Sequence, residues 1–406
     1  MRSFILLILV PFLLSAQVKP GIDVLADDGF ALLKGKRVGL ITNPTGMSSR
    51  FVSTVDLLAS APSVKLVALY APEHGVRGDV TAGGKVDAYT DPATGVPVHS
   101  LYGRTRKPTP EMLKGVEVLV YDIQDIGSRS YTFINTMAYA MEAAAEQGID
   151  FVVLDRPDPL GGVRVEGNIL DTAFRSFVGQ YPIPYVYGMT CGEFAAMLNA
   201  EGWLAGGKRC RLTVVPMRNW KRSMLWKETG LPWVPTSPHV PDAPDALYYS
   251  ATGIIGELET VNIGVGYTMP FQLTGAEWID AVKLAAELNS RGLRGVQFRP
   301  LFYKPYYGKQ QGKLLQGVQL HLTDPAAVDL TALNLHILEA LIRLHPDRNP
   351  FVLADSSRLA MFDKVMGTDT VRKRLTAGER AERIMAGWGA ERSTFMKARA
   401  KYLRYE

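Results

Sequence analysis

Apolar runs alternate with stretches of helical spacing over the first 160 residues. The apolar runs, which predict strands, cover residues 36–42, 64–70, 96–100, 116–121 and 151–154. Helical spacing is found at residues 51–60 and 132–147, and a further helix start is expected at residues 109–112, with proline at its first position. Strands that are apolar along their whole length are typical of a parallel sheet covered on both faces. The pattern therefore predicts an α/β fold with a doubly wound parallel sheet.

The pattern changes after Asp158, where proline, glycine and aromatic residues become frequent. Beyond this crossing, helices are expected at residues 190–205, 277–291, 330–344 and 370–402, and strands at 211–216, 296–303 and 315–323. Residues 220–275 have weak periodicity and many Pro and Gly residues, which favours a functional loop system. We therefore expect a doubly wound α/β domain over residues 17–180 and a smaller α/β C-terminal domain over residues 181–406.

The first 16 residues have the features of a secretory signal peptide. Arg2 supplies the charge, an apolar run follows from Phe4 to Leu14, and Ala16 offers a small residue for cleavage before Gln17. The run is shorter than the roughly 20 residues that a membrane-spanning helix needs. We expect a secreted or periplasmic protein with no stable membrane insertion after cleavage.

Composition narrows the classes of partner. The formal net charge is +5 and the isoelectric point about 9, but Lys and Arg are spread among acidic residues. Nucleic acid is not an expected partner, because no basic block or nucleic-acid motif is present, whereas an anionic cell-wall polymer is compatible with the charge. Cys191 and Cys210 could pair or could be two buried apolar residues, and no Cys/His spacing predicts a metal site.

Polar residues follow each buried strand of the predicted sheet. In open parallel sheets ligands bind beyond the carboxyl ends of the strands, so these residues are expected to form one site. They are Asn43; Glu73, His74 and Arg77; Asp122, Gln124, Asp125, Arg129 and Tyr131; and Asp155, Arg156 and Asp158. The first exit lacks G-x-G-x-x-G, and the P-loop motif G-x-x-x-x-G-K followed by Ser or Thr is absent from the sequence, so a nucleotide cofactor is not expected. No cofactor of another kind is indicated.

Paired carboxylates suit glycoside hydrolysis, in which one protonates the leaving oxygen and the other attacks or activates water. Glu73 is the first choice for the acid, with His74 beside it and Asp122 as the partner carboxylate. The alternatives are that Glu73 and His74 merely shape their turn and that Asp122 caps backbone amides. Asp155 and Asp158 are expected to be structural, because Asp-Arg-Pro-Asp-Pro favours a turn.

The other residues of this set are expected to bind substrate. Arg77 and Arg129 could bind a substrate carboxylate through two hydrogen bonds, although ordinary surface ion pairs are an equal alternative. Tyr131 could stack on a sugar or pack at a helix start. Asn43, Gln124, Asp125 and Arg156 complete the expected binding set. A serine nucleophile is disfavoured because no G-x-S-x-G is present, and Cys191 lies in a helix-capping stretch.

Several motifs resemble one bacterial family. They are Ile41-Thr-Asn-Pro-Thr-Gly46, Pro72-Glu-His-Gly-Val-Arg-Gly78, Tyr102-Gly-Arg-Thr-Arg-Lys-Pro-Thr-Pro-Glu-Met112, Asp122-Ile-Gln-Asp-Ile-Gly-Ser-Arg129, Leu154-Asp-Arg-Pro-Asp-Pro-Leu-Gly-Gly162 and Gly230-Leu-Pro-Trp-Val-Pro-Thr-Ser-Pro238. In this order they resemble the exo-β-N-acetylmuramidases typified by NamZ, formerly a domain of unknown function, and the likeness spans about residues 21–405. The resemblance implies a Rossmann-like catalytic domain over residues 17–180, with the C-terminal domain completing the active-site cleft between them. It also implies release of terminal N-acetylmuramic acid from the non-reducing end of peptidoglycan fragments and a catalytic role for Glu73. The lactyl carboxylate of that sugar would suit the proposed arginines.

One loop departs from the family pattern. Residues 257–268 retain a family glutamate as Glu259, an expected substrate contact, but Val265 and Tyr267 stand where similar enzymes carry Glu and Arg. This departure leaves the sugar preference open. Besides the exo-muramidase, two alternatives are a carbohydrate- or muropeptide-binding protein without turnover and a hydrolase of a related acidic amino sugar.

Overall fold

The apolar strands of the first half form one sheet. The computed structural model describes residues 17–78 and 88–406, and the predicted signal peptide, residues 1–16, lies outside them. In the described chain this sheet has seven strands in the order β3-β4-β2-β1-β5-β6-β7, all parallel to their neighbours except β3. The strands are β1 Arg37–Thr42, β2 Lys65–Ala71, β3 Tyr89–Thr90, β4 Pro97–Ser100, β5 Val118–Asp122, β6 Asp150–Leu154 and β7 Arg211–Val215. The predicted Rossmann-like sheet is confirmed.

Helices cover both faces of this sheet. Alternate residues of a strand point to opposite faces, so Leu119 and Tyr121 pack with helices α3 and α4, whereas Val118 and Val120 pack with α1 and α2. These helices are α1 Gly21–Asp27, α2 Thr54–Ser60, α3 Phe133–Gln147 and α4 Cys191–Ala200. The expected helix start at residues 109–112 is wrong, because this stretch forms turns that stop at Gly115, whose φ is 82°.

Strand β7 belongs to the first sheet and not, as expected, to the second domain. It pairs in parallel with β6 from Asp150↔Arg211 to Leu154↔Val215. The chain leaves the sheet after β6, runs through a long loop region, and returns through α4 to add this strand. The first sheet therefore extends past the predicted boundary at residue 180, a long-range pairing that local periodicity does not reveal.

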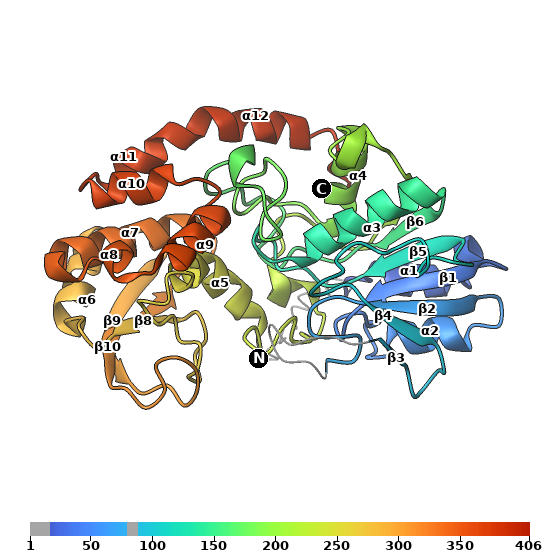
Figure 1. Cartoon of the computed structure of the whole chain (residues 1–406), viewed down its shortest axis with the longest axis horizontal. Coiled ribbons are helices and arrows are strands. Elements are labelled where there is room, and N and C mark those ends of the chain that lie inside the picture. The colour runs from blue at the N-terminus through green and yellow to red at the C-terminus, as the bar shows by residue number, and fades with distance from the viewer. Residues whose placement is uncertain (1–16, 79–87) are drawn as a thin grey trace, which may run out of the picture.

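The second domain is built on a smaller antiparallel sheet in the order β8-β10-β9 (Figure 1). Its strands are β8 Leu273–Ala276, β9 Val296–Tyr303 and β10 Leu315–Leu322, and the helices packed with them are α5 Ala243–Gly256, α6 Ala281–Ser290, α7 Leu330–Leu344, α8 Pro350–Leu353 and α9 Ser356–Met366. Helix α5 lies inside the segment expected to be loops. Nine of its residues are buried, and an apolar stripe of period 3.6 is weak in a helix covered on most sides.

The C-terminal helices cross back to the first domain. The single helix expected over residues 370–402 is three helices, α10 Thr370–Thr376, α11 Ala381–Met385 and α12 Gly389–Arg399, and Gly378 with φ 80° lies at the first break. Figure 1 shows α12 running from the second domain toward α4. At its end, the Tyr405 hydroxyl donates to the Asp155 carboxylate at 2.5 Å. This contact confirms that Asp155 is structural.

A buried arginine joins the two domains. Arg129 follows β5, is 1% exposed, and donates from its guanidinium to four backbone carbonyl oxygens. Two of these, Val365 and Met366, end α9 in the second domain, at 3.1 and 2.8 Å. A cation at this position is favoured by the negative end of the helix dipole. Burial nevertheless lowers the pKa of Arg129 to about 10. Because the guanidinium is buried and binds four backbone carbonyls, Arg129 is a structural clamp and not, as expected, a substrate ligand.

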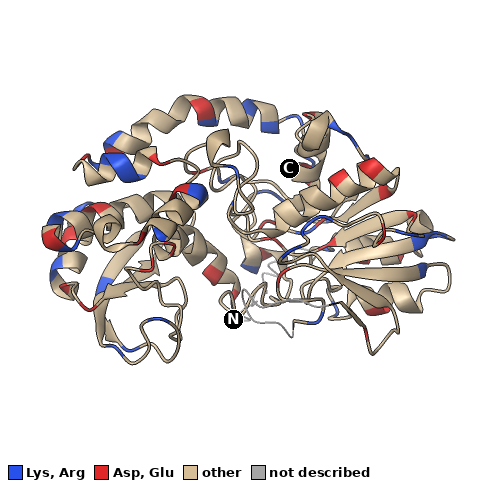
Figure 2. Cartoon of the chain, viewed as in Figure 1, with Lys and Arg blue, Asp and Glu red and all other residues tan. Residues whose placement is uncertain are grey.

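Other surface and chemical features bear on the sequence expectations. Cys191 and Cys210 are both buried and unpaired, which favours the second of the two readings. Lys and Arg are interleaved with Asp and Glu over both domains (Figure 2). Within residues 17–78 and 88–406, every helix is too short or too polar to cross a bilayer.

We expect Arg129→Met to destabilise the protein by roughly 3 kcal/mol or more, because four buried carbonyl oxygens lose charged donors. The urea midpoint of unfolding, followed by tryptophan fluorescence, measures the loss. The same change at the exposed Arg348 is the control and should leave the midpoint unaltered. Equal midpoints for the two variants would show that the clamp contributes little.

Candidate active site

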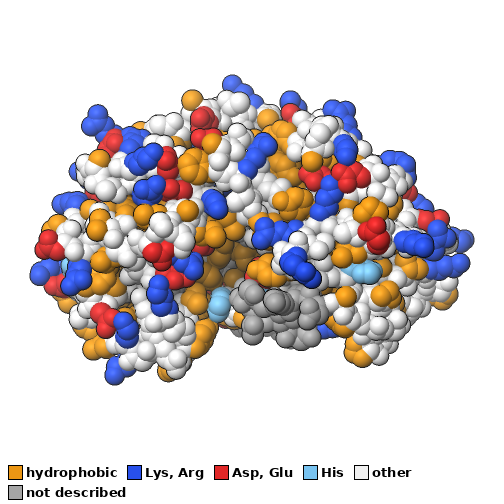
Figure 3. All heavy atoms as spheres, in the orientation of Figure 1, with side chains coloured by type: hydrophobic (Ala, Val, Ile, Leu, Met, Phe, Trp, Pro, Cys, Tyr) orange, Lys and Arg blue, Asp and Glu red, His pale blue; other side chains and the backbone are white. Residues whose placement is uncertain are grey.

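A cavity of about 470 Å³ lies where the two domains face each other. Figure 3 shows this face hollowed between the domains, with hydrophobic side chains in the hollow and a histidine at its edge. The first domain contributes Glu73, His74 and Tyr131, and the second contributes Glu257, Glu259, Lys309 and Arg358. Four of the residues expected from the sequence, Glu73, His74, Tyr131 and Glu259, are thus brought together.

Glu73 reaches the cavity from the turn after β2. Pro72 stiffens this turn, and His74 and Gly75 have φ values of 75° and 79°, which reverse the chain within two residues. The Tyr102 hydroxyl hydrogen-bonds the Glu73 carboxylate, and burial followed by this carboxylate raises the pKa of Tyr102 to about 12. The turn therefore presents a hydrogen-bonded carboxylate to the cavity.

Backbone strain is concentrated at the cavity. Among the described residues, six that are not glycine have positive φ, and three of these line the cavity: His74, Glu259 and Phe271. Such conformations cost on the order of 1–3 kcal/mol each and persist where the surrounding structure imposes them. The strained positions belong to both domains. The packing within each domain therefore imposes the backbone conformation of its own cavity wall.

Glu257 is a second cavity carboxylate, one that the expected site set did not include. It is the C-cap residue of α5, and burial raises its pKa to about 7, with Arg358 opposing and Glu259 reinforcing the shift. The expectation that residues 220–275 form loops hid this residue, because Glu257 is placed by a helix. The sequence feature that could have drawn attention to Glu257 is its position just after the mostly apolar residues 251–256.

Glu259 is held between two cations of its own domain. Lys309 and Arg358 approach its carboxylate to 3.0 and 2.7 Å. The altered family loop does form part of the wall, since Val265 lines the cavity, while Tyr267 stacks on Tyr306 with ring centroids 5.4 Å apart.

Aromatic and histidine side chains complete the wall. The Tyr131 hydroxyl donates to Thr236 Oγ1 at 2.7 Å, and the ring packs edge-on against Phe133, so the packing alternative accounts for its position. His239 stacks on Tyr307 and lies 3.0 Å from its hydroxyl. Burial, and to a lesser degree His74, lowers the pKa of His239. His239 and Tyr307 were not expected from the sequence.

Asp122 does not line the cavity, which corrects its expected role as the partner carboxylate. It is fully buried, and Arg156 donates to its two oxygens at 2.5 and 2.9 Å. The Thr54 hydroxyl donates to the same carboxylate at 2.5 Å. Arg156 also donates to the Met47 carbonyl at 2.8 Å, so both charged residues fasten strand exits and are not substrate ligands.

The remaining expected ligands also have structural partners outside the cavity wall. Asn43 accepts from the Thr45 amide at 3.0 Å, and Gln124 donates to the Asp125 and Pro157 carbonyls at 2.7 Å. The Asp125 carboxylate accepts from Gly127 and Tyr187, and its burial raises its pKa to about 6. Arg77 pairs with Asp91 and Asp56, each at 3.0 Å, as the surface-pair alternative predicts. These four positions are therefore not the binding set that the strand exits suggested.

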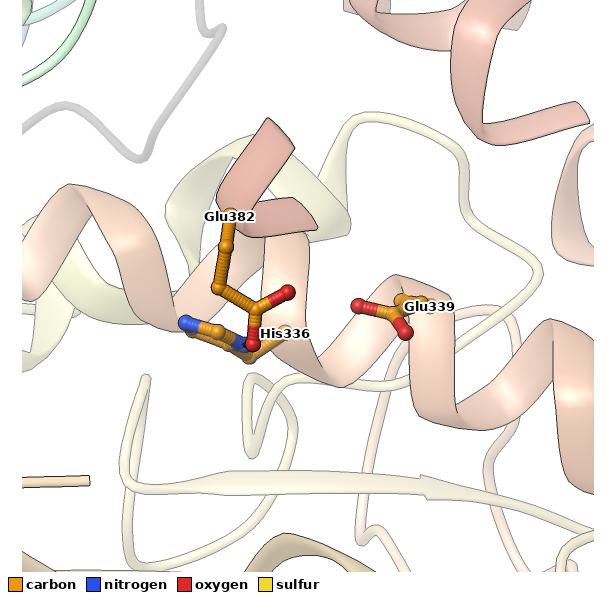
Figure 4. A group of neighbouring side chains, drawn as sticks. All are labelled: His336, Glu339 and Glu382. Carbon is orange, nitrogen blue, oxygen red and sulfur yellow. Dashed lines mark ion pairs between the residues drawn. The ribbon is translucent and has the colours of Figure 1, made fainter. Parts of the chain in front are cut away.

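One group of possible metal ligands lies elsewhere in the described chain. Figure 4 shows His336 and Glu339 on α7 facing Glu382 of α11. The Arg291 guanidinium donates to Glu339 at 3.0 Å and lies 3.3 Å from His336 Nδ1, so a protein cation already balances the acids. We regard this group as an ion network that joins α6, α7 and α11.

Comparisons with known proteins cover nearly the whole chain. Residues 38–244 and 247–405 match the N-terminal and C-terminal models of the family described as exo-β-N-acetylmuramidase NamZ. The chain is 46% identical over 389 residues to the peptidoglycan β-N-acetylmuramidase NamZ of Bacillus subtilis strain 168, covering 96% of this chain and 92% of that protein. Two solved structures of DUF1343 family proteins from Bacteroides fragilis NCTC 9343 share 50% and 31% identity, with TM-scores of 0.92 and 0.78, and each comparison covers 96% of this chain and 99% of the other. The chain belongs to the exo-β-N-acetylmuramidase NamZ family.

Proposed function

We propose that this protein is a glycoside hydrolase that releases terminal N-acetylmuramic acid from peptidoglycan fragments. Family membership over both domains supports the reaction class, and the relative from Bacillus subtilis bears the name of this activity. The observation that carries the proposal is the cavity that joins a carboxylate from each domain, Glu73 and Glu257. Its volume of about 470 Å³ is in the range of pockets that hold one small ligand, which suits a single terminal sugar.

The two carboxylates have different surroundings, which suits different roles. A general acid must be protonated at the working pH, and burial raises the pKa of Glu257 to about 7. We assign the acid to Glu257, which would give its proton to the leaving glycosidic oxygen. Glu73 would either attack the sugar or activate a water molecule. This exchanges the role first expected for Glu73, while keeping it in the reaction.

Leaving-group dependence tests the two roles. Glu257→Gln should lower kcat/KM for a MurNAc–GlcNAc disaccharide by about 10²–10⁴-fold, because the sugar oxygen leaves unprotonated. The loss should be much smaller for para-nitrophenyl β-N-acetylmuramic acid, whose phenolate needs little protonation. Glu73→Gln should lower the rates for both substrates, and Glu277→Gln, at an exposed carboxylate, is the control.

Two results would change the assignment. If Glu73→Gln, and not Glu257→Gln, retained most of the kcat/KM for the nitrophenyl substrate, Glu73 would be the acid. Sugar binding by the wild-type protein without release from any substrate would favour the binding-protein alternative.

The pH profile of kcat/KM is a separate test of Glu257. Because the protonated form is the active acid, kcat/KM for the disaccharide should fall as the pH rises through about 7, by about tenfold per pH unit at higher pH. The alkaline limb should disappear in Glu257→Gln, leaving a low, flat rate. A limb that persists in the variant would belong to another group.

We also propose that the protein is exported to the periplasm or beyond. The apolar run of residues 4–14 supports this, and Gln17 already makes a tertiary contact, its side-chain amide donating to the Gly230 carbonyl at 2.9 Å. Mass spectrometry of the protein recovered from the periplasm or medium should give a mature N-terminus at Gln17. Retention of Met1, or recovery only from the cytoplasm, would contradict export.

A further inference from the structure

One wall of the cavity carries more positive than negative charge. On the side of the second domain, Lys309 and Arg358 share the single carboxylate of Glu259, at 3.0 and 2.7 Å. The side chains are not buried: 67% of Lys309, 36% of Arg358 and 33% of Glu259 remain exposed. Glu257 lies on the same wall, but it is protonated in its proposed role as the acid. Two cations with the single counter-ion Glu259 then leave one positive charge at the cavity.

The three side chains are held by separate segments. Arg358 lies in the first turn of α9, whose N-terminus is capped by Asp355 through the amides of Ser357 and Arg358 at 2.9 and 3.0 Å. The helix dipole disfavours a cation in a first turn, and the Asp355 carboxylate, which interacts with Arg358, offsets this cost. Lys309 lies between β9 and β10, on a segment anchored by the Tyr306 amide, which donates to the Gly266 carbonyl at 2.6 Å.

The remaining charges of the cavity wall set the direction in which a substrate anion would lie. Among the described residues, Glu73 and Glu257 are the other acidic residues of the wall, and neither carboxyl group attracts an anion. The arginines first expected to bind a carboxylate are engaged elsewhere, Arg77 with two aspartates and Arg129 with four carbonyls. Complementary charge is therefore found only at the Lys309–Arg358 side of the described wall.

We propose that Arg358 and Lys309 bind the lactyl carboxylate of the substrate sugar, and that Glu259 holds the two cations in place. This proposal rests on the proposed function and names the group that determines its sugar specificity. The guanidinium offers a planar pair of donors that fits a carboxylate, and the ammonium adds a second charge. A sugar without the lactyl group would leave this charge uncompensated.

Paired substrates isolate the carboxylate. The para-nitrophenyl β-glycosides of N-acetylmuramic acid and N-acetylglucosamine differ by the lactyl group alone. Arg358→Gln and Lys309→Met should each lower kcat/KM for the muramic acid substrate about tenfold to a hundredfold, and that for the glucosamine substrate by no more than about twofold. Lys309 lies on an exposed segment, so Lys309→Met should fold normally and can test the proposal if Arg358→Gln folds poorly.

Two further variants complete the design. Lys313→Met is the matched control, because Lys313 is on the same segment but pairs with Glu277 at 2.7 Å and lies outside the cavity wall. It should leave both substrates unaffected. Glu259→Gln removes the carboxylate that positions both cations, and it should reduce the preference for the muramic acid substrate over the glucosamine substrate, without abolishing it as the loss of a cation would.

The outcomes separate this inference from the proposed function. Equal losses on both substrates in Arg358→Gln and Lys309→Met would overturn the carboxylate site, and an unchanged preference in Glu259→Gln would overturn the positioning role of Glu259. Calorimetric binding of the two free sugars gives a readout without turnover. A wild-type protein that cleaves no fragment but binds N-acetylmuramic acid at least about tenfold more tightly, with the preference lost in Arg358→Gln, would overturn the hydrolase and retain the site.

Discussion

The guanidinium of Arg129 is buried between two domains that each supply half of the cavity. Its charge is stabilised by backbone carbonyls, two of them at the C-terminal end of α9. The same helix carries Arg358 at its other end, in the cavity wall. Because a helix is stiff over eleven residues, fixing one end limits where the other can lie. The position of the cavity cation therefore depends on a contact at the opposite end of α9.

The usual binding crevice of a doubly wound sheet is reduced in this protein to a pocket of about 30 Å³, lined in part by Thr45, Gln124 and Arg156. The strand order reverses between β1 and β5, where such sheets ordinarily bind their ligands. Here the Asp122–Arg156 ion pair and the Thr54 hydroxyl occupy that point. Removing either charge would leave the other buried without a partner, which makes the pair a structural fixture. The ligand cavity is displaced to the end of β2, where the second domain supplies the facing wall.

The charged residues of the cavity fall into two groups, one proposed to carry out the reaction and the other to bind the substrate. Glu73 and Glu257 come from different domains and differ in environment, which is how enzymes assign unlike roles to two carboxylates. Glu259 has two cations within 3.0 Å and is tied to them. A carboxylate so paired is poorly suited to donate a proton, but it can orient the cations beside it. The wall of the second domain thereby combines the proposed acid with the proposed anion site.

The sequence by itself determined most strands of the first sheet, three of its four covering helices and the exits where polar residues cluster, and three residues of these exits, Glu73, His74 and Tyr131, line the cavity. Those features depend on periodicity and turn chemistry, which act between near neighbours in the chain. Tertiary structure alone decided which charged side chains have structural partners. Asp122 pairs with Arg156, 34 residues away, and Arg129 donates to carbonyl oxygens 236 and 237 residues away. It also placed β7 in the first sheet and brought Glu257 and Arg358 to face Glu73. Ionisable side chains at strand exits look alike in sequence, and only burial and long-range partners separate the structural ones from those left facing the cavity.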